Sequence, residues 1–176
     1  KTGVMVLPFL LLIAVSVVQD AWIHYQNEAG RFAIDTPYKL QEKIIRTTTE
    51  IGLLEYHNFY RRISGSDSIQ VDYRVSYVDY PIEYNLSDSA ELVQSILETT
   101  VDESVRSVNG ELLYSNDDYS YQLPGKVWRI NYMEGNDAIR AKACIRGNRF
   151  YLLQALYPVD KSTQVNDHFF KSFRLQ

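Results

Sequence analysis

The sequence contains a single cysteine, Cys144, among 176 residues. One cysteine cannot form an internal disulfide, and it excludes metal sites that are built on several spaced cysteines. Cys144 lies between Ala143 and Ile145, where it is typical of a small residue in a strand. We therefore interpret it as structural and not as a catalytic nucleophile.

The sequence also lacks the motifs of common enzymatic chemistry. GxSxG, the Walker loop, GxGxxG and HExxH are all absent. The three histidines, His24, His57 and His168, are not at the spacing of metal ligands. The pair Asp117-Asp118 belongs to a predicted loop, where acids are usually turn formers, and calcium would need several more oxygen ligands. We expect no catalytic residue, no bound metal and no cofactor.

Neither sign of charge dominates the chain. It has 18 Lys and Arg against 22 Asp and Glu, which gives a formal net charge of −4. This mildly acidic balance argues against a dedicated nucleic-acid binder. No internal repeat or low-complexity linker interrupts the sequence, so residues 22–176 are expected to form one domain.

The longest apolar run of the chain lies near its beginning. Val4–Val18 is almost entirely apolar, and Lys1 is the one basic residue before it. The run has the length of a signal-peptide core, whereas a spanning helix needs about 20 apolar residues. Ala14–Ser16 supplies small residues for cleavage, and no cysteine follows that could carry a lipid anchor. We expect residues 1–21 to be a signal peptide, or an N-terminal anchor if uncleaved. The mature domain would be periplasmic or extracellular, without a stable membrane span.

Residues 126–158 are predicted to form three strands joined by two tight turns. Gly135-Asn136 and Gly147-Asn148 each lie between runs of strand-forming residues. Glycine and asparagine tolerate the backbone angles of two-residue hairpin turns. Such turns fix the register, so we expect Trp128 opposite Ala143 and Ile145 opposite Phe150.

One face of this predicted three-stranded meander is apolar and needs a cover. It carries Trp128, Ile130, Tyr132, Ile139, Ala141, Ala143, Ile145, Phe150, Leu152 and Leu156. Gln154 is its one polar residue. The segment from Ser87 to Val108 has apolar residues at helical spacing, so we expect this helix to cover the face.

The opposite face of the meander carries a basic cluster. A two-residue turn would place Arg129 opposite Lys142, with Arg140 diagonal to it. Like charges at such positions destabilise a sheet unless an acid or an anion lies between them. Two interpretations stay open: a binding site for an anion or a partner protein, or a solvated face neutralised by neighbouring acids. Tyr151 and Tyr157 share this face, and if exposed they would add contact area to a protein interface.

The remaining segments alternate between strand patterns and polar turns, and the chain closes with a short helix. Strands are expected at residues 22–27, 31–35, 39–47, 50–62 and 71–77, with weaker ones at 111–115 and 119–123. Residues 63–68 are predicted to be a polar loop. A last helix should start near Ser162, with Val165, Phe169 and Phe173 at four-residue spacing.

The order of these elements and motifs resembles the PsbP/Mog1-like group, in particular its small exported bacterial proteins. The resemblance rests on Trp22, Gly30–Ile34 with Pro37, the mid-chain helix, Asn148–Tyr151, Tyr157-Pro158 and Phe169–Leu175. It implies an α+β fold, an α/β/α sandwich around a mainly antiparallel sheet. Relatives such as a photosystem II extrinsic subunit and a Ran-binding import factor imply a non-enzymatic binding or assembly role. The missing lipid-anchor cysteine departs from the lipoprotein members.

The sequence favours one function and leaves an alternative open. The favoured hypothesis is a non-catalytic binding or assembly module of the cell envelope with a protein partner. Arg129, Arg140, Lys142, Tyr151 and Tyr157 are the candidate contacts. The alternative is a carrier of a small ligand or lipid, which would need an apolar pocket of several hundred Å³ between sheet and helix. An enzyme ranks below both.

Overall fold

The computed structural model describes residues 22–61, 71–165 and 167–176, and its centre is a seven-stranded sheet. All neighbouring strands are antiparallel. In spatial order they are β3 (Leu40–Thr49), β4 (Gly52–Arg61), β5 (Asp72–Asp79), β9 (Arg149–Pro158), β8 (Asp137–Arg146), β7 (Gly125–Tyr132) and β6 (Glu111–Asp117). The proposed signal segment and the loop expected at 63–68 lie outside the described residues.

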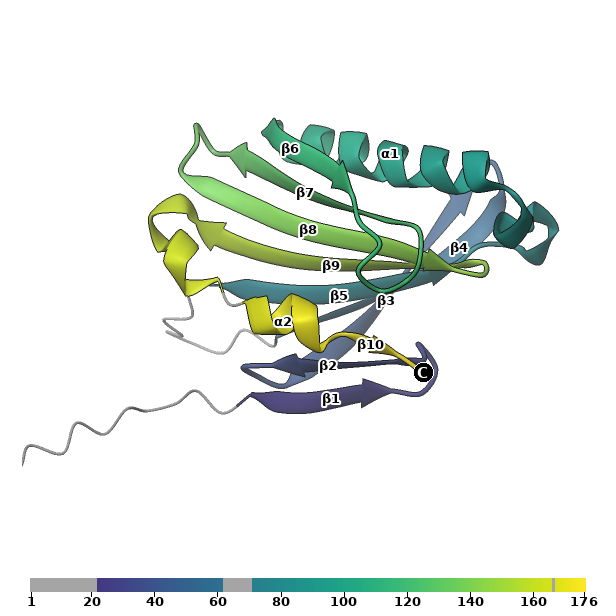
Figure 1. The fold of residues 1–176 in the computed structure, drawn as a ribbon, viewed down its shortest axis with the longest axis horizontal. Coiled ribbons are helices and arrows are strands. Elements are labelled where there is room, and N and C mark those ends of the chain that lie inside the picture. Colours follow the sequence, from purple (N-terminus) through teal and green to yellow (C-terminus); the bar gives the residue numbers. More distant parts are fainter. Residues whose placement is uncertain (1–21, 62–70, 166) are drawn as a thin grey trace, which may run out of the picture.

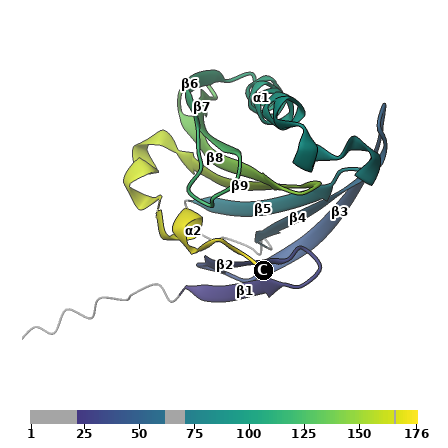
Figure 2. The same cartoon turned by 45° about the vertical axis from the view of Figure 1, so that its right-hand side comes forward.

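Two further layers cover this sheet, one on each face (Figures 1 and 2). Helix α1 (Ala90–Ser107) lies on one face. The other face carries helix α2 (Asp167–Ser172) and a small antiparallel sheet of β1 (Ile23–Asn27), β2 (Phe32–Thr36) and β10 (Arg174–Leu175). Three short 3-10 helices are η1 (Ile82–Tyr84), η2 (Leu86–Asp88) and η3 (Val159–Gln164). The predicted α+β sandwich around an antiparallel sheet is confirmed, but a second sheet shares the layer opposite α1.

Helix α1 forms where its apolar spacing predicts, and it covers the expected face. Its inward residues Val93, Leu97 and Val101 are buried in one cluster with Trp128 and Ile130 of β7. The start differs slightly from the prediction. The Ser89 side chain accepts a hydrogen bond of 3.2 Å from the backbone N–H of Leu92, so the helix begins after Ser89. Residues 87 and 88 belong to η2 instead.

The register of the meander is as predicted at one turn and displaced at the other. Across Gly147-Asn148, Ile145 pairs with Phe150, as expected from a two-residue loop. Across the first turn, Trp128 pairs with Ala141 instead of Ala143. Since side chains alternate with a period of two residues, the displacement leaves each residue on its predicted face.

The displaced register comes from a four-residue loop between β7 and β8. Met133, Glu134 and Gly135 all have positive φ angles, of 50°, 56° and 86°. The Asn136 side-chain amide donates a hydrogen bond of 2.9 Å to the backbone oxygen of Met133, which helps to close the loop. A non-glycine residue with positive φ is uncommon, so the simpler two-residue turn was the expected solution. The consequence is that Arg129 pairs with Arg140, and Lys142 with Val127.

An aromatic core joins the small sheet to the large one. Phe32 on β2 is fully buried, and its ring lies 5.5 Å from that of Phe59, 6.4 Å from Tyr151 and 5.8 Å from Phe173. These partners come from β4, from β9 and from the residue between α2 and β10. Segments from both ends of the described chain are therefore fixed to the central strands by one cluster of rings.

Candidate binding site

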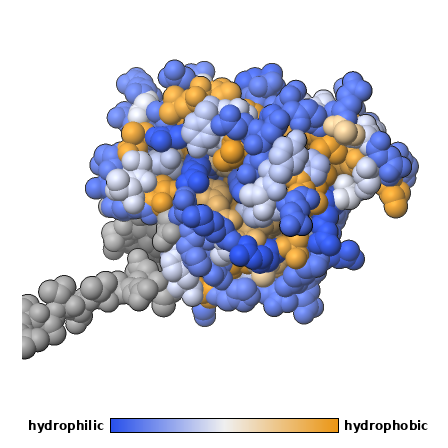
Figure 3. All heavy atoms as spheres, viewed as in Figure 1, coloured by the Kyte–Doolittle hydropathy of each residue, from blue (hydrophilic) through white to orange (hydrophobic). Residues whose placement is uncertain are grey.

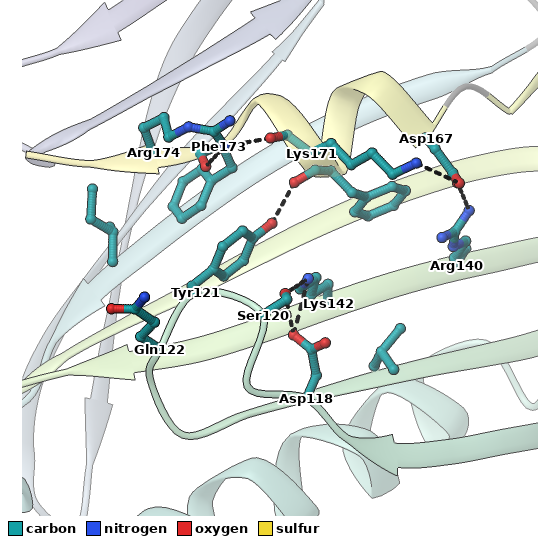
Figure 4. Close-up of a pocket in the computed structure, with 13 residues that line it drawn as sticks. Asp118, Ser120, Tyr121, Gln122, Arg140, Lys142, Asp167, Lys171, Phe173 and Arg174 are labelled. Carbon is teal, nitrogen blue, oxygen red and sulfur yellow. Dashed lines mark hydrogen bonds and ion pairs between the residues drawn. The ribbon is translucent and has the colours of Figure 1, made fainter.

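The basic cluster predicted from the sequence lies on the face of the large sheet opposite α1. Arg140 and Lys142 extend from β8 toward α2 and the loop after β6 (Figure 4). With the loop, α2 and β10 they enclose a cleft of about 830 Å³. The cleft is lined by Asp118, Ser120, Tyr121, Gln122, Val127, Arg140, Lys142, Asp167, Phe170, Lys171, Phe173, Arg174 and Leu175.

Two carboxylates separate the cations of the cleft. Arg140 Nη1 lies 2.5 Å from Asp167 Oδ1, and Lys171 Nζ lies 3.6 Å from Asp167 Oδ2. Lys142 Nζ lies 3.0 Å from Asp118 Oδ2 and also donates to the Ser120 hydroxyl. The hydrogen bond from Arg140 holds the pKa of Asp167 below its ordinary value. Arg140 and Lys142 are thus each paired with an acid, as the second interpretation expects, while a binding role for the cleft stays a hypothesis.

Aromatic rings form an apolar floor under these charges. The Lys142 ammonium lies 4.1 Å from the centre of the Tyr121 ring, and the Arg140 guanidinium 4.8 Å from that of Phe170. The Tyr121 hydroxyl donates a hydrogen bond of 2.5 Å to the Phe170 backbone oxygen. This bond ties the loop to α2, and burial raises the pKa of Tyr121. Cations over aromatic faces gain electrostatic attraction, so the rings also hold the charged groups in place.

The outer rim of the cleft carries two further cations that sequence reasoning did not single out. Lys171 is 77% exposed, and Arg174 is exposed while its Nη1 donates to the backbone oxygens of Lys171 and Phe173. In the view of Figure 3 hydrophobic residues show between hydrophilic ones over this part of the surface. The sequence pattern could have located these two cations. Phenylalanines at 169, 170 and 173 point inward and therefore leave residues 171 and 174 to face outward.

Arg129 does not line the cleft, although it pairs with Arg140 across β7 and β8. Its guanidinium lies 5.9 Å from the centre of the Tyr157 ring. Its Nε is buried, and no described residue accepts a hydrogen bond from it. The predicted cluster is therefore divided: Arg140 and Lys142 line the cleft, whereas Arg129 lies half-buried outside it, beside Tyr157.

Tyr151 and Tyr157 do not meet the condition of exposure under which they would add contact area to an interface. Their exposed fractions are 1% and 4%, and both belong to the core between the two sheets. The Tyr151 hydroxyl donates a hydrogen bond of 2.8 Å to the Gly30 backbone oxygen. The small sheet covers this part of the face, and strand alternation alone could not predict that cover. Neither tyrosine is available as a surface contact.

The groups considered for catalysis are engaged in structural contacts. Cys144 is 1% exposed, and burial raises the pKa of its thiol to about 12, so it is protonated at neutral pH. His24 and His168 both contact Asp35, and His57 bonds to Glu42 and stacks on Tyr77. Among residues 22–61, 71–165 and 167–176, no group of three His, Cys, Asp or Glu side chains could hold a metal ion. Nor does any helix in these ranges have both the length and the apolar character to cross a membrane.

Comparison with known proteins identifies the fold. No protein-family model matches this chain, and no curated protein matches it in sequence. Among solved structures, it is similar to cyanobacterial PsbP (CyanoP) from Synechocystis sp. PCC 6803, with a TM-score of 0.57. The match covers 92% of this chain and 96% of that one at 10% sequence identity. The chain therefore has a PsbP-like fold, as the resemblance implied, while the likeness to Mog1 and to exported bacterial proteins stays a prediction.

Proposed function

We propose that this chain is a non-catalytic binding or assembly module of the cell envelope, and that the cleft holds a segment of a partner protein. The observation that carries the proposal is the composition of the cleft. Its lining combines four cations with two carboxylates, around the rings of Tyr121, Phe170 and Phe173. The whole chain has a net charge of −4, so the cleft is a local concentration of positive charge on an acidic protein.

This chemistry matches an acidic segment that also carries an apolar or aromatic side chain. Lys171 and Arg174 stand at the rim, where they would meet carboxylates of the partner as these approach. Such exposed charges steer association and make it depend on salt. The aromatic floor would supply the buried contact that sets the lifetime of the complex. The location in the envelope rests on the apolar run Val4–Val18 and the expected export.

The test introduces a photocrosslinking amino acid in place of Leu175 in the cleft, and separately in place of Glu98 on the outer side of α1. Illumination of intact cells should give one discrete adduct from position 175 and none from position 98. Lys171→Glu with Arg174→Glu should abolish the adduct, because both substitutions turn rim cations into anions. Illumination of cell lysates in low and in high salt then reports the electrostatic share of binding, because the yield of adduct should fall as salt screens the rim cations.

A matched pair of charge reversals controls for net charge. Lys43→Glu with Arg106→Glu changes the net charge equally at exposed positions of β3 and α1, away from the cleft. The adduct should persist in this variant. Equal adducts at both crosslinking positions, or an adduct lost equally in both double variants, would argue against the cleft as the binding site.

A second hollow bears on the carrier alternative. It has a volume of about 490 Å³ and lies between α1 and the sheet, in the place where a carrier was expected to have its pocket. Its lining mixes an apolar floor with many hydroxyl and amide side chains, which a lipid chain would desolvate. A lipid carrier is therefore the less favoured function.

A further inference from the structure

The hollow beside α1 is a groove over the part of the large sheet that the helix does not cover. Helix α1 packs over β6, β7 and β8, and the same sheet face continues past it onto β9, β5 and β4 (Figure 2). Val78 and Phe150 form a buried apolar floor. The groove lies on the opposite face of the sheet from the cleft, so binding in the groove is independent of the proposed function.

Most of the side chains that line the walls of the groove are polar and neutral. On α1, Ser95, Thr99 and Glu103 follow one another at four-residue intervals, which places them in one row along the helix. The sheet contributes Tyr56, Asn58, Ser76 and Gln154, with Tyr80 just beyond β5. Glu103 is the one charged residue among those that line the groove.

Gln154 is the most unusual of these residues. It lies in β9, a strand inside the sheet, on the face that is otherwise apolar, and it is half-buried. Its side-chain amide makes no hydrogen bond with any described residue. Because Gln154 is half-buried and lines the hollow, its amide faces the groove, where water or a ligand can take its hydrogen bonds. The hydrogen-bonding capacity of this amide is therefore not used within the described fold and is open to a ligand in the groove.

Two hydroxyl groups are available in the same way. Neither the Tyr56 nor the Tyr80 hydroxyl is hydrogen-bonded to a described residue, and burial raises the pKa of Tyr80 to about 12, so it remains a donor at neutral pH. Asn58 and Ser76 are different, because the Ser76 hydroxyl donates to Asn58 Oδ1 at 2.9 Å. The groove thus offers an amide and two phenolic hydroxyls above an apolar floor.

This set of groups selects among ligand classes. A charged ligand would find one opposite charge among the lining residues, the Glu103 carboxylate. Arg74, which lies opposite Gln154, is already paired with Asp72. A lipid chain would desolvate the amide and hydroxyls without replacing their hydrogen bonds. A sugar ring has an apolar face that can rest on the floor of Val78 and Phe150, and hydroxyl groups that can bond to the polar walls. We propose that the groove between α1 and strands β4, β5 and β9 binds a neutral saccharide, with Gln154 as its central hydrogen-bonding residue.

The experiment screens the full 176-residue chain on an array of neutral and acidic oligosaccharides and then titrates the strongest neutral one in solution. Gln154→Leu should weaken that affinity about tenfold or more, because it removes the amide and keeps the side-chain size. Thr99→Trp should block the groove from an exposed position of the helix, without altering the core. Palmitate should not compete with the saccharide.

Two control variants introduce the same residue types elsewhere. Gln26→Leu lies on β1, in the layer on the far side of the sheet, and Glu98→Trp lies on the outer surface of α1. Both should bind the saccharide as the unmodified chain does. The proposal is overturned if no neutral oligosaccharide binds, if only acidic ones bind, or if Gln154→Leu and Thr99→Trp leave the affinity unchanged.

Discussion

Arg129 and Arg140 lie directly opposite each other on β7 and β8, and their charges are balanced differently. Arg140 has an ion pair with Asp167 at 2.5 Å. Arg129 has no carboxylate partner among the described residues, and its buried Nε lacks a hydrogen-bond acceptor there. Within the described part of the chain, its guanidinium contacts the face of the Tyr157 ring. Of the two arginines, Arg129 therefore bears the larger uncompensated desolvation cost.

Replacing Arg129 with methionine should stabilise the protein. Arg129→Met keeps an unbranched side chain to pack against Tyr157 and removes both the unpaired Nε and the repulsion of Arg140. The free energy of unfolding should rise by about 0.5–1 kcal/mol, since a buried unsatisfied donor costs somewhat more than the ring contact returns. Urea denaturation of the two proteins measures this difference.

Arg140→Met is the matched control, because it removes the paired arginine. It loses the bond to Asp167, which at a partly exposed pair contributes at most about 1 kcal/mol, so stability should fall slightly or stay the same. A variant Arg129→Met that is less stable than Arg140→Met would show that Arg129 contributes favourable interactions beyond those seen at its ring contact.

A second prediction concerns Asp35, which joins three elements. His24 on β1 and His168 on α2 each hydrogen-bond to one of its carboxylate oxygens, both at 2.8 Å. The hydrogen bond from His24, supported by that from His168, holds the pKa of Asp35 below its ordinary value of 3.8. Asp35→Asn should therefore lower the free energy of unfolding at neutral pH, because the ionised carboxylate is the form that the folded state favours.

The sign of the pH dependence follows from the direction of the shift. A lowered pKa in the folded state means that the unfolded chain binds the proton more readily, so the contribution of Asp35 is complete above about pH 3.8. It is lost as the pH falls below this value toward the folded pKa. Urea denaturation at several pH values measures the free energy of unfolding of the unmodified chain and of Asp35→Asn. The difference between the two should become smaller only in that acidic range. For Asp102→Asn, at an exposed position of α1, the difference from the unmodified chain should not change in this way with pH.

The fold could be predicted where local chemistry determines it. Gly147-Asn148 permits one short turn, and the pairing of Ile145 with Phe150 follows directly. The turn at Gly135-Asn136 looked the same in sequence, but Met133 and Glu134 adopt positive φ angles that their residue types disfavour. The longer loop depends on how β7 and β8 pair within the whole sheet, and no local sequence motif predicts that pairing.

The site was harder to predict because it depends on what covers each face. Arg140 and Lys142 were correctly placed on one face, but the acids that pair with them come from residues 118 and 167, distant in sequence. Tyr151 was considered as a surface contact only if exposed, and it is buried because the small sheet, in which β2 pairs with β10, lies over it. Alternation predicts the side of a strand on which a residue lies, and tertiary structure alone determines whether that side is covered.

Cys144 should be unreactive until the protein unfolds. Its thiol is 1% exposed and its pKa is raised to about 12, so both access and thiolate formation are suppressed. A thiol-specific chromogenic reagent should therefore modify the unfolded chain rapidly in urea and the native protein only at the rate of its opening. Fast labelling of the native protein would mean that the central sheet opens locally around β8.

The strongest destabilisation is expected at Phe32, the ring that links the two sheets. Its side chain is fully buried and contacts rings from β4, from β9 and from the segment after α2. Phe32→Ala should lower the free energy of unfolding by about 3–5 kcal/mol, since it removes this buried area and leaves a cavity between rigid layers. Ile44→Ala is the control, because Ile44 on β3 is 43% exposed and should change stability by less than about 1 kcal/mol. If the two variants lost equal stability, the small sheet would be a loosely attached layer, and the cleft that β10 helps to form would not be rigid enough to hold a partner in one orientation.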